Sequence, residues 1–481
     1  MGYKTIVGLE IHVELSTKTK AFCSCENAFG GEPNSRVCPV CLALPGATPV
    51  LNEQVVNYTV MSGLALNCTI NHRSKFDRKN YFYPDLTKGF QITQNDMPIC
   101  TEGYLEIDGD EGFKKVGIFQ IQMEEDTGKS LHSDDETLLD YNRCGVPLIE
   151  IVSKPDMNSG REGREFLEKL KNTLKYIGVS DVKMEEGSLR CDVNVNVKDE
   201  ETGRKTNVTE VKNLNSFRAV EKAIDYEVER HIKLLENNED EPKTTRRWDD
   251  VNNETVLMRV KYTAADYRFA PEGDLVPVVI DDEYIESVRK QLPELPEAKK
   301  ERFMKQYGLS EYDSKILTAT KQLSNYFEEI ANSFNDYNMI SNWIMTEVLR
   351  RVDDLEEGFK LSFETKDFIE LLSVIKSGKI NNNAGKKVLR EMFETSKKPM
   401  EIIEEKGLIQ VSDDSQIETW VDEVLSENPQ SIEDIKNGKD RAFGFLVGQV
   451  MKKSKGKANP GVVNEILKSR VQWKKISTHH L

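Results

Sequence analysis

Apolar and polar residues alternate along several short segments of the first 290 residues. Within residues 7–15 every odd position is apolar, and the even positions carry Glu10, His12 and Glu14. Successive side chains of a β-strand point to opposite faces, so this segment predicts a strand with an apolar back and an ionisable front. Three later segments repeat the pattern: 117–123, 191–197 and 208–213.

Helical periodicity marks two segments between these strands. One is residues 166–177, and Gly178 directly after it is a suitable C-terminal cap. The other begins after Ser216, a residue type that caps helix N-termini, and continues to Leu235. Strands mixed with helices predict an α+β first domain.

Beyond two prolines in residues 291–300 the pattern becomes almost entirely helical. Glycines and one Asn-Pro pair interrupt it, at Gly308, Gly358, Gly378, Gly407 and Asn459-Pro460. These changes predict three domains: an α+β domain over 1–292, a helical domain over 293–405 and a small helical tail domain over 406–475. The last residues, WKKISTHHL, suggest no role.

Composition narrows the class of protein. The 481 residues are 31% charged and 38% apolar, and no stretch approaches the roughly 20 apolar residues of a membrane helix. The N-terminus alternates like a strand and lacks the apolar block of a signal peptide. We therefore expect a cytoplasmic protein without a membrane span.

Charge is distributed unevenly along the chain. The net charge of −16 argues against nucleic-acid binding over the whole surface. Residues 439–475, however, carry ten Lys or Arg and only two acidic residues. Such a segment is a candidate phosphate-binding surface, and a solvated basic helix pair is the ordinary alternative.

Four of the eight cysteines form two close pairs, Cys23 with Cys25 and Cys38 with Cys41. Two short pairs separated by a dozen residues are typical of a tetrahedral four-thiolate zinc site, which would be structural because no ligand position stays open. Two disulfides are the alternative, which a cytosolic location disfavours. For the remaining four we expect buried thiols: Cys68, Cys100, Cys144 and Cys191.

The front faces of the predicted strands are rich in oxygen ligands. Asp192, Asn194 and Asn196 alternate along one strand, and another ends in Glu124, Glu125 and Asp126. Carboxylates with a single imidazole suit Mg²⁺ or Mn²⁺ better than zinc. A solvated polar face is the alternative for any one strand taken alone.

Two other catalytic classes are disfavoured. Gly128-Lys129-Ser130 resembles the end of a phosphate-binding P-loop, but that motif requires glycine where this chain has Met123. Neither a Gly-x-Ser-x-Gly nucleophile elbow nor an amidase signature is present. If the reaction uses a nitrogen donor, this chain gives no sign of releasing it.

Several motifs resemble one family, the B subunits of bacterial aspartyl/glutamyl-tRNA amidotransferases. They are VGLEIHVEL, SKFDRKNYFYPDLTKGFQITQ, MEEDTGKS, GVPLIEIVSKPD, VSDVKMEEGSLRCDVNVNV and EVKNLNSFRAVEKAI, followed by FGFLVGQVMKKSKGKANPGVVNEIL near the C-terminus. The likeness covers nearly all of residues 1–470 in the expected order.

This resemblance implies a fold and a reaction. The fold would be a glutamine-synthetase-like cradle catalytic domain with a mainly antiparallel sheet, followed by helical and tail domains. With ATP and Mg²⁺ the protein would phosphorylate the side-chain carboxylate of Glu-tRNA(Gln) or Asp-tRNA(Asn). Ammonia from a partner amidase (the A subunit, a glutaminase) would then displace phosphate, and a small C subunit would complete a heterotrimer.

The resemblance also implies roles for particular residues. The strongest candidates for magnesium binding and catalysis are Glu10, His12 and Glu125. Other candidates for the metal–nucleotide centre or the aminoacyl end are Glu124, Glu150, Ser188, Arg190 and Glu210. Asp192 and Asn194 join them because they lie on the same predicted front face. Lys79 and Lys88 match polar positions near the ammonia path and the acyl phosphate, a surface lysine being the ordinary alternative for each. The tail domain would bind tRNA through Lys452, Lys453, Lys455 and Lys457.

The chain departs from the family pattern in residues 266–274. Ala270 and Gly273 stand where a bulky aromatic residue and a proline are usual, which we expect to loosen that turn. Tyr81 and Tyr83 alternate along a strand, where packing is favoured over stacking on adenine.

Two alternative functions remain at this point. A zinc-containing adaptor that delivers tRNA to an amidase would need no ATP chemistry, and its ionisable front face would be solvated. A glutamine-synthetase-like ligase acting on free glutamate would have no use for a basic tail.

Overall fold

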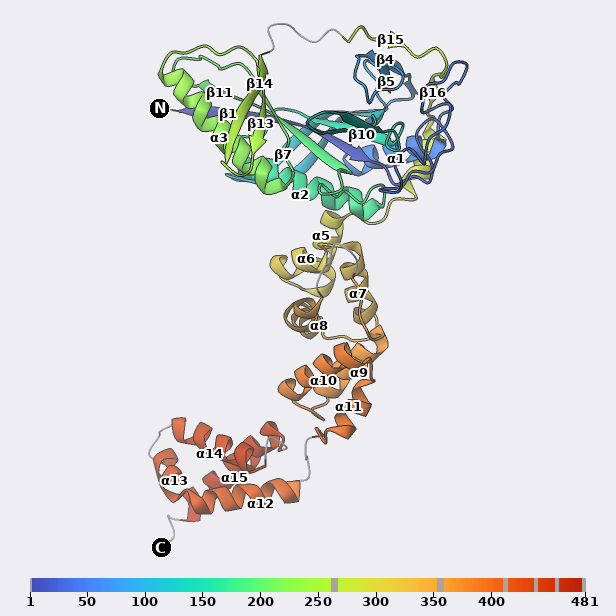
Figure 1. The fold of residues 1–481 in the computed structure, drawn as a ribbon. Helices are drawn as coiled ribbons and strands as arrows, with labels where there is room; N and C mark the ends of the chain where they lie inside the picture. The colour runs from blue at the N-terminus through green and yellow to red at the C-terminus, as the bar shows by residue number, and fades with distance from the viewer. Residues whose placement is uncertain are drawn as a thin grey trace. The chain divides into compact units, whose positions relative to one another are not determined.

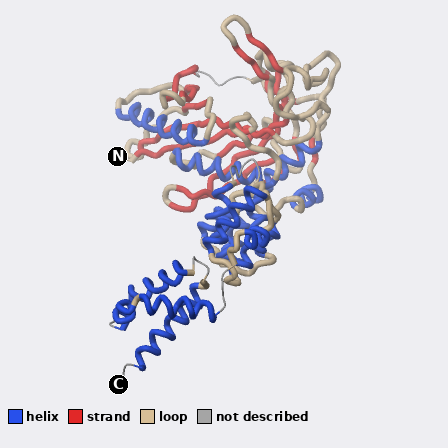
Figure 2. The backbone as a smooth tube through the Cα atoms, turned by 60° about the horizontal axis from the view of Figure 1, so that its bottom comes forward, coloured by secondary structure: helices blue, strands red, loops and turns tan. Residues whose placement is uncertain are grey.

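The structure is a computed structural model that describes residues 2–260, 267–352, 359–409, 414–436, 440–454 and 458–477. It divides into two compact units, residues 1–296 and 297–481. The first unit contains the strands, and the second is helical in its described residues (Figure 2). The predicted mixture of α and β structure is confirmed. The three-domain boundaries stay a prediction.

The first unit is built on a nine-stranded sheet. Its strand order is β14-β13-β12-β11-β1-β10-β7-β6-β2, and every pairing is antiparallel except β12 with β13. The strands of this sheet are β1 (Tyr3–Glu14), β2 (Thr69–Ile70), β6 (Cys100–Gly109), β7 (Gly112–Glu125), β10 (Pro147–Ser153), β11 (Leu189–Asp199), β12 (Thr209–Lys212), β13 (Thr244–Asp249) and β14 (Glu254–Val260). The predicted mainly antiparallel sheet is therefore confirmed.

Smaller strands and four helices complete this unit. The remaining strands are β3 (Arg73–Ser74), β4 (Asp77–Asn80), β5 (Phe90–Thr93), β8 (Lys129–His132), β9 (Thr137–Asp140), β15 (Ala270–Pro271) and β16 (Val278–Val279). The helices are α1 (Glu53–Ala65), α2 (Gly160–Ile177), α3 (Phe217–Glu236) and α4 (Asp282–Arg289).

Helices α2 and α3 pack together on one face of the large sheet (Figure 1). The odd residues of β1, such as Leu9 and Ile11, enter the same core as Leu167 of α2 and Val220 of α3. Because strand side chains alternate, the even residues of β1 face the opposite side. This packing leaves the ionisable face of β1 free of helices α2 and α3.

Both predicted helix ends in this unit are confirmed. Gly178 adopts the left-handed conformation (φ 75°) that ends α2, which glycine reaches without strain from a Cβ. Ser216 caps α3 by accepting a hydrogen bond from the backbone N–H of Ala219.

The regular elements described in the second unit are helices. Its helices are α5 (Pro296–Tyr307), α6 (Glu311–Leu317), α7 (Lys321–Ala331), α8 (Tyr337–Trp343), α9 (Thr365–Lys376), α10 (Asn382–Thr395), α11 (Pro399–Glu405), α12 (Asp414–Glu427), α13 (Pro429–Lys436), α14 (Asp440–Lys453) and α15 (Pro460–Ser477). A π-helical turn, Ile344–Val348, and a 3₁₀ turn, Leu349–Arg351, follow α8. No described helix is long and apolar enough to cross a membrane.

The predicted breaks agree with the helix ends. Gly308, Gly378 and Gly407 all have positive φ, and Pro460 begins α15. Gly358 lies outside the described residues. Two separate hydrophobic cores form in this unit, one among residues 303–403 and one among residues 417–471.

Candidate functional site

An acidic cluster lies on the face of the sheet opposite α2 and α3. Glu10 and His12 project from β1, and Glu150 projects from the adjacent strand β10, where His12 and Glu150 are direct cross-strand partners. One ligand atom from each of the three lies within 4.8 Å of the others. His12 Nε2 is 3.6 Å from a carboxylate oxygen of Glu150 and 3.9 Å from one of Glu124.

Glu124 is held in place by neighbouring polar side chains. Its carboxylate accepts hydrogen bonds from Thr93 Oγ1 at 2.5 Å and from the side-chain amides of Gln91 and Gln122 at 3.1 Å. Gln122 also donates to Glu150 at 2.9 Å. Glu124 and Glu150 are 1% and 7% exposed, so these two carboxylates are buried, whereas Glu10 and His12 remain partly exposed at the edge of the cluster.

Burial and crowding perturb the cluster's protonation. Burial and then the charge of Glu150 raise the pKa of Glu124 to about 7, and the same two causes raise the pKa of Glu10. Burial opposes ionisation of Glu150, but its bond to His12 and the charge of Lys79 hold its pKa below the ordinary value. Carboxylates crowded around one imidazole fit the ligand preference of Mg²⁺, whose charge would relieve their repulsion.

Lys79 lies on β4 and faces this cluster. Burial alone would lower the pKa of Lys79, but Glu124, Glu150, Tyr267 and Glu10 together raise it. Its ammonium is 5.2 Å from the centre of the Tyr267 ring. Lys79 is thus a cation held beside buried carboxylates, where negative charge on a bound substrate would also be stabilised.

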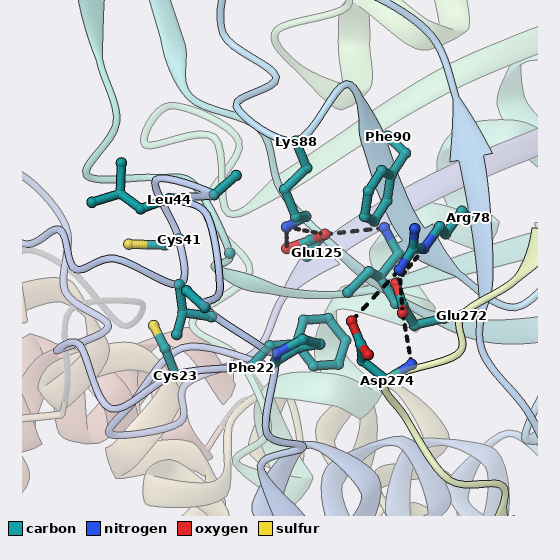
Figure 3. A pocket seen from close by; sticks show the side chains of 16 residues that line it. Phe22, Cys23, Cys41, Leu44, Arg78, Lys88, Phe90, Glu125, Glu272 and Asp274 are labelled. Atoms are coloured by element: carbon teal, nitrogen blue, oxygen red, sulfur yellow. Dashed lines mark hydrogen bonds and ion pairs between the residues drawn. The ribbon is translucent and has the colours of Figure 1, made fainter.

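Glu125 points into a different space from Glu124. Consecutive residues of a strand face opposite sides, and Glu125 instead lines a cavity of about 240 Å³ (Figure 3). Its carboxylate accepts hydrogen bonds from Lys88 Nζ at 2.6 Å and from the backbone N–H of Ile92 at 3.0 Å. Among the described residues, the three-residue acidic cluster contains Glu150 beside Glu10 and His12, and it does not contain Glu125.

Three predicted residues lie on the strands at the other side of β1. Asp192 is the cross-strand partner of Glu10, and Asn194 is that of Glu210. Lys212 bridges Asp192 and Glu210, with its ammonium 3.3 Å from the latter. This segment therefore extends the polar face and supplies a cation of its own.

Ser188 makes local contacts, whereas Arg190 binds a carboxylate from a remote part of the chain. The hydroxyl of Ser188 contacts Asp181 and accepts from the backbone N–H of Lys183 at 2.8 Å. Arg190 binds Asp126 at 2.5 Å. Burial and then Asp126 raise the pKa of Glu14 to about 8, so the end of β1 carries a second crowded carboxyl pair.

The four paired cysteines converge as the spacing predicts. Cys23, Cys25, Cys38 and Cys41 have sulfur atoms that all lie within 4.8 Å of one another. The Cys38 and Cys41 sulfurs are 3.8 Å apart, which matches the edge of about 3.8 Å for a tetrahedron with Zn–S bonds of about 2.3 Å. Disulfide sulfurs would be about 2.05 Å apart, and all eight cysteines are free thiols. The hydrogen bond between Cys23 and Cys41 lowers the pKa of Cys41 and raises that of Cys23, so these two sulfurs share a proton.

The four tail lysines are not equivalent. Lys452 is exposed, whereas Lys453 binds Glu427 at 2.6 Å and Glu423 at 2.8 Å. Lys455 and Lys457 lie outside the described residues.

Comparison with known families assigns the chain. A family model described as the GatB/GatE catalytic domain matches residues 5–286, and a second, the GatB domain, matches residues 325–471. The chain belongs to the GatB family. Its members include the proteins named as B subunits of aspartyl/glutamyl-tRNA(Asn/Gln) amidotransferase, so the predicted family is confirmed.

Relatives match over almost their full length. The amidotransferase B subunit of Finegoldia magna is 53% identical over 473 residues, which cover 98% of this chain and 100% of the relative. That of Clostridium acetobutylicum is 52% identical over 469 residues, covering 97% and 98%. That of Thermotoga maritima is 51% identical over 480 residues, covering 98% and 100%.

Sequence reasoning named Glu124 but missed the residues that hold its carboxylate: Gln91, Thr93 and Gln122. Gln122 and Glu124 are two positions apart, as are Gln91 and Thr93, so the period-two pattern places each pair on one face. The signal was therefore present in the sequence.

Sequence reasoning also missed a clamp beside the cavity. Glu272, 4% exposed, receives two hydrogen bonds of 2.8 Å from Arg78. Ala270 pairs with Arg78 between β15 and β4. Strand pairing therefore holds this part of residues 266–274, the segment that departs from the family pattern. Residues 261–266, which contain its beginning, lie outside the described residues.

Proposed function

We propose that this chain is the ATP-using component of a tRNA-dependent amidotransferase. It phosphorylates the side-chain carboxylate of Glu-tRNA(Gln) or Asp-tRNA(Asn), and ammonia released from glutamine by a partner amidase then displaces the phosphate. A small third protein completes the complex. The names of the relatives support the proposal that this chain is a subunit of an amidotransferase complex. The chemistry of the acidic cluster supports the phosphorylation step.

The buried acidic cluster is the observation that carries this proposal. A non-catalytic tRNA adaptor would be free to solvate its acidic residues. Glu124 and Glu150 are instead almost completely buried beside His12. The pKa values of Glu124 and Glu10 stay raised despite the neighbouring cations His12 and Lys79, so the negative charge of the cluster is only partly balanced. A divalent cation would supply the missing positive charge and would in turn bind the phosphates of a nucleotide.

The proposed reaction uses two neighbouring sites, of which the acidic cluster is the first. Glu10, His12 and Glu150, with Glu124 beside them, would hold Mg²⁺, which neutralises the crowded phosphate oxygens when ATP is bound. Lys79 is placed to stabilise negative charge on the carboxylate being activated. Asp192, Asn194 and Glu210 extend the same face.

Lys88 and Glu125 supply a polar wall on the other side of β7. Their 2.6 Å contact lies in the cavity of Figure 3. When ammonia attacks an acyl phosphate, its nitrogen becomes positively charged and must release a proton as phosphate leaves, and the Glu125 carboxylate is a candidate to accept that proton. We therefore retain Glu125 as a catalytic candidate with a role in proton transfer, and we assign the magnesium binding predicted for it to Glu150 and Glu124 instead.

Two further parts of the proposal concern zinc and tRNA. The geometry of the four cysteines fits a structural zinc ion, and the exposed Lys452 in the tail fits contact with tRNA phosphates. Ser188 and Arg190 lie at the end of β11 and remain candidates for the aminoacyl end.

The decisive experiment compares two Glu→Gln variants in the assembled complex. The chain is combined with its amidase and small partner proteins, ATP, Mg²⁺, ammonium and Glu-tRNA(Gln), and Gln-tRNA formation and ADP release are measured. Glu150→Gln should abolish both while tRNA binding persists. Glu254→Gln, an exposed position on edge strand β14 of the same sheet, should leave both unchanged.

Each competing function has a distinct outcome. Unaltered Gln-tRNA formation by Glu150→Gln would refute the proposed chemistry and favour the adaptor. Glutamine formed from free glutamate at a comparable rate would favour a small-molecule ligase.

A further inference from the structure

One lysine of the first unit is completely buried. Lys20, at 0% exposure, lies beside the cysteine cluster. Its ammonium donates to the backbone carbonyl of Arg36 at 2.8 Å and lies 3.8 Å from the sulfur of Cys41. Its neighbour two residues earlier, Lys18, is exposed.

A buried ammonium requires compensation. Taking a charge out of water costs several kcal/mol unless an opposite charge or strong acceptors replace the lost solvent. Among the ion pairs of the described residues, Lys20 has no carboxylate partner within 4.0 Å. One carbonyl and one sulfur are therefore its closest compensation.

The cysteine cluster has the opposite need. A divalent zinc ion with four thiolates carries an excess of roughly two negative charges. Such sites are stabilised by hydrogen-bond donors to their sulfurs, and loss of one typically costs about 10–100-fold in metal affinity. The backbone N–H of Cys38 is one donor to the Cys41 sulfur, at 3.1 Å, and the Lys20 ammonium is a charged one.

Lys20 also connects this cluster with the catalytic candidates. A Cβ at Gly145 would lie 3.7 Å from the side chain of Lys20 and 3.8 Å from those of both Cys41 and Glu125. The hydroxyl of Thr87, directly before Lys88, donates to the carbonyl of Cys41 at 2.9 Å. The cysteine loop and the Lys88–Glu125 pair therefore form adjoining walls of one cavity.

We propose that Lys20 is the positioning residue that balances the charge of the zinc–thiolate cluster through Cys41. It thereby keeps the cysteine loop against the wall of the Glu125 cavity. This inference rests on the zinc site proposed above. It concerns metal affinity and does not depend on the phosphorylation chemistry.

The test measures metal retention by the full chain. Lys20→Met and Lys20→Gln remove the charge, the second retaining a polar side chain for the Arg36 carbonyl. Lys18→Met is the matched control. Zinc content is measured after purification without chelators, and zinc loss is followed as transfer to a chromogenic chelator. We expect both Lys20 variants to lose affinity by about 10–100-fold, and Lys18→Met to match the unaltered chain.

Cobalt substitution separates charge balance from general packing. With Co²⁺ in place of zinc, loss of a positive charge beside Cys41 should move the sulfur-to-metal charge-transfer band to lower energy, while the ligand-field bands still report a tetrahedral site. A band at its original position, or unchanged zinc affinity in either folded variant, would overturn the proposal.

The remaining outcomes are also decisive. If neither Lys20 variant folds in saturating zinc, Lys20 serves folding of the core and the proposal is wrong. If the unaltered chain contains no zinc, the zinc site itself fails.

Discussion

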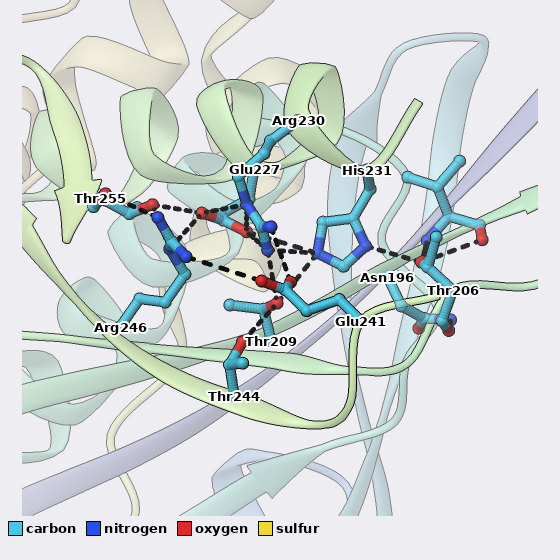
Figure 4. A network of polar contacts seen from close by, with 11 residues as sticks. Asn196, Thr206, Thr209, Glu227, Arg230, His231, Glu241, Thr244, Arg246 and Thr255 are labelled. Atoms are coloured by element: carbon cyan, nitrogen blue, oxygen red, sulfur yellow. Dashed lines mark hydrogen bonds and ion pairs between the residues drawn. The ribbon is translucent and has the colours of Figure 1, made fainter. Parts of the chain in front are cut away.

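Glu227 on α3 is the centre of a buried polar network between α3 and strands β12 to β14 (Figure 4). Its carboxylate is fully buried and accepts bonds from Arg230 at 2.8 and 2.9 Å. It also lies 3.3 Å from Arg246 and from His231, and it contacts Thr255. Glu227→Gln keeps the shape of this side chain and removes its charge, so it tests whether the charge stabilises the fold.

The size of the effect follows from the pKa of Glu227. Burial alone would raise this pKa, but the bonds from His231 and Arg230 outweigh burial and lower it from 4.5 to about 2. At about 1.4 kcal/mol for each tenfold change, this corresponds to about 3 kcal/mol of stabilisation at neutral pH. Arg230 keeps its 2.6 Å bond to Glu241 in the variant, so we expect a loss of about 3 kcal/mol and not complete unfolding.

The measurement must isolate this region, because a chain with several cores need not unfold in one step. Hydrogen–deuterium exchange of peptides covering α3 and β13 reports the free energy of opening there. Glu229→Gln, an exposed position two residues along the same helix, is the matched control and should change that free energy by less than about 0.5 kcal/mol.

The pH dependence has a definite sign. A depressed folded-state pKa contributes stability that is complete above the ordinary pKa of 4.5 and disappears as pH falls towards about 2. The difference between the unaltered chain and Glu227→Gln should therefore shrink across this interval. A Glu227→Gln chain as stable as Glu229→Gln at pH 7, or a difference that grows on acidification, would refute the reasoning.

Lys88, the cysteine cluster and the tail offer three further tests. Lys88→Met removes the cation that pairs with the buried Glu125 carboxylate. We therefore expect the free energy of opening measured by hydrogen exchange in β7 to fall by about 3 kcal/mol; unchanged exchange would contradict this. Chelation of zinc should lower the melting temperature and expose residues 23–41 to protease, reversibly on adding zinc; an unchanged melting curve would argue against a structural metal. Lys452→Gln should reduce the salt dependence of tRNA binding by about one phosphate contact. Lys453→Gln should reduce it less, because the Lys453 ammonium already binds two glutamates. Identical salt slopes for both variants and the unaltered chain would contradict the tail assignment.

Local sequence was sufficient for the elements and their ends. The period-two pattern of residues 7–15 identified the front and back of β1, and Gly178 and Ser216 mark where α2 ends and α3 begins. These features depend on neighbouring residues, so they can be read from short segments. Cysteine spacing likewise anticipated the four-sulfur cluster because its two pairs lie on one short loop region.

Strand order decided which carboxylates meet. β1 lies between β10 and β11, which brings Glu150 and Asp192 beside residues of β1 that are more than a hundred positions away. The sequence alone grouped Glu125 with Glu10 and His12, whereas the alternation along β7 directs Glu124 towards them and Glu125 into the cavity. No local pattern specifies a neighbouring strand, because pairing depends on how the whole sheet assembles.

Burial of charge was also a property of the tertiary structure. Lys18 and Lys20 lie in the same short segment, yet only Lys20 is enclosed, by residues 36–41 and Gly145. Sequence by itself determined the family, the alternating faces, the helix caps and the cysteine pairs, all of which are encoded in local residue order. Only the tertiary structure decided which charges share a buried space, because desolvation and Coulomb interaction depend on distances that folding creates between remote segments.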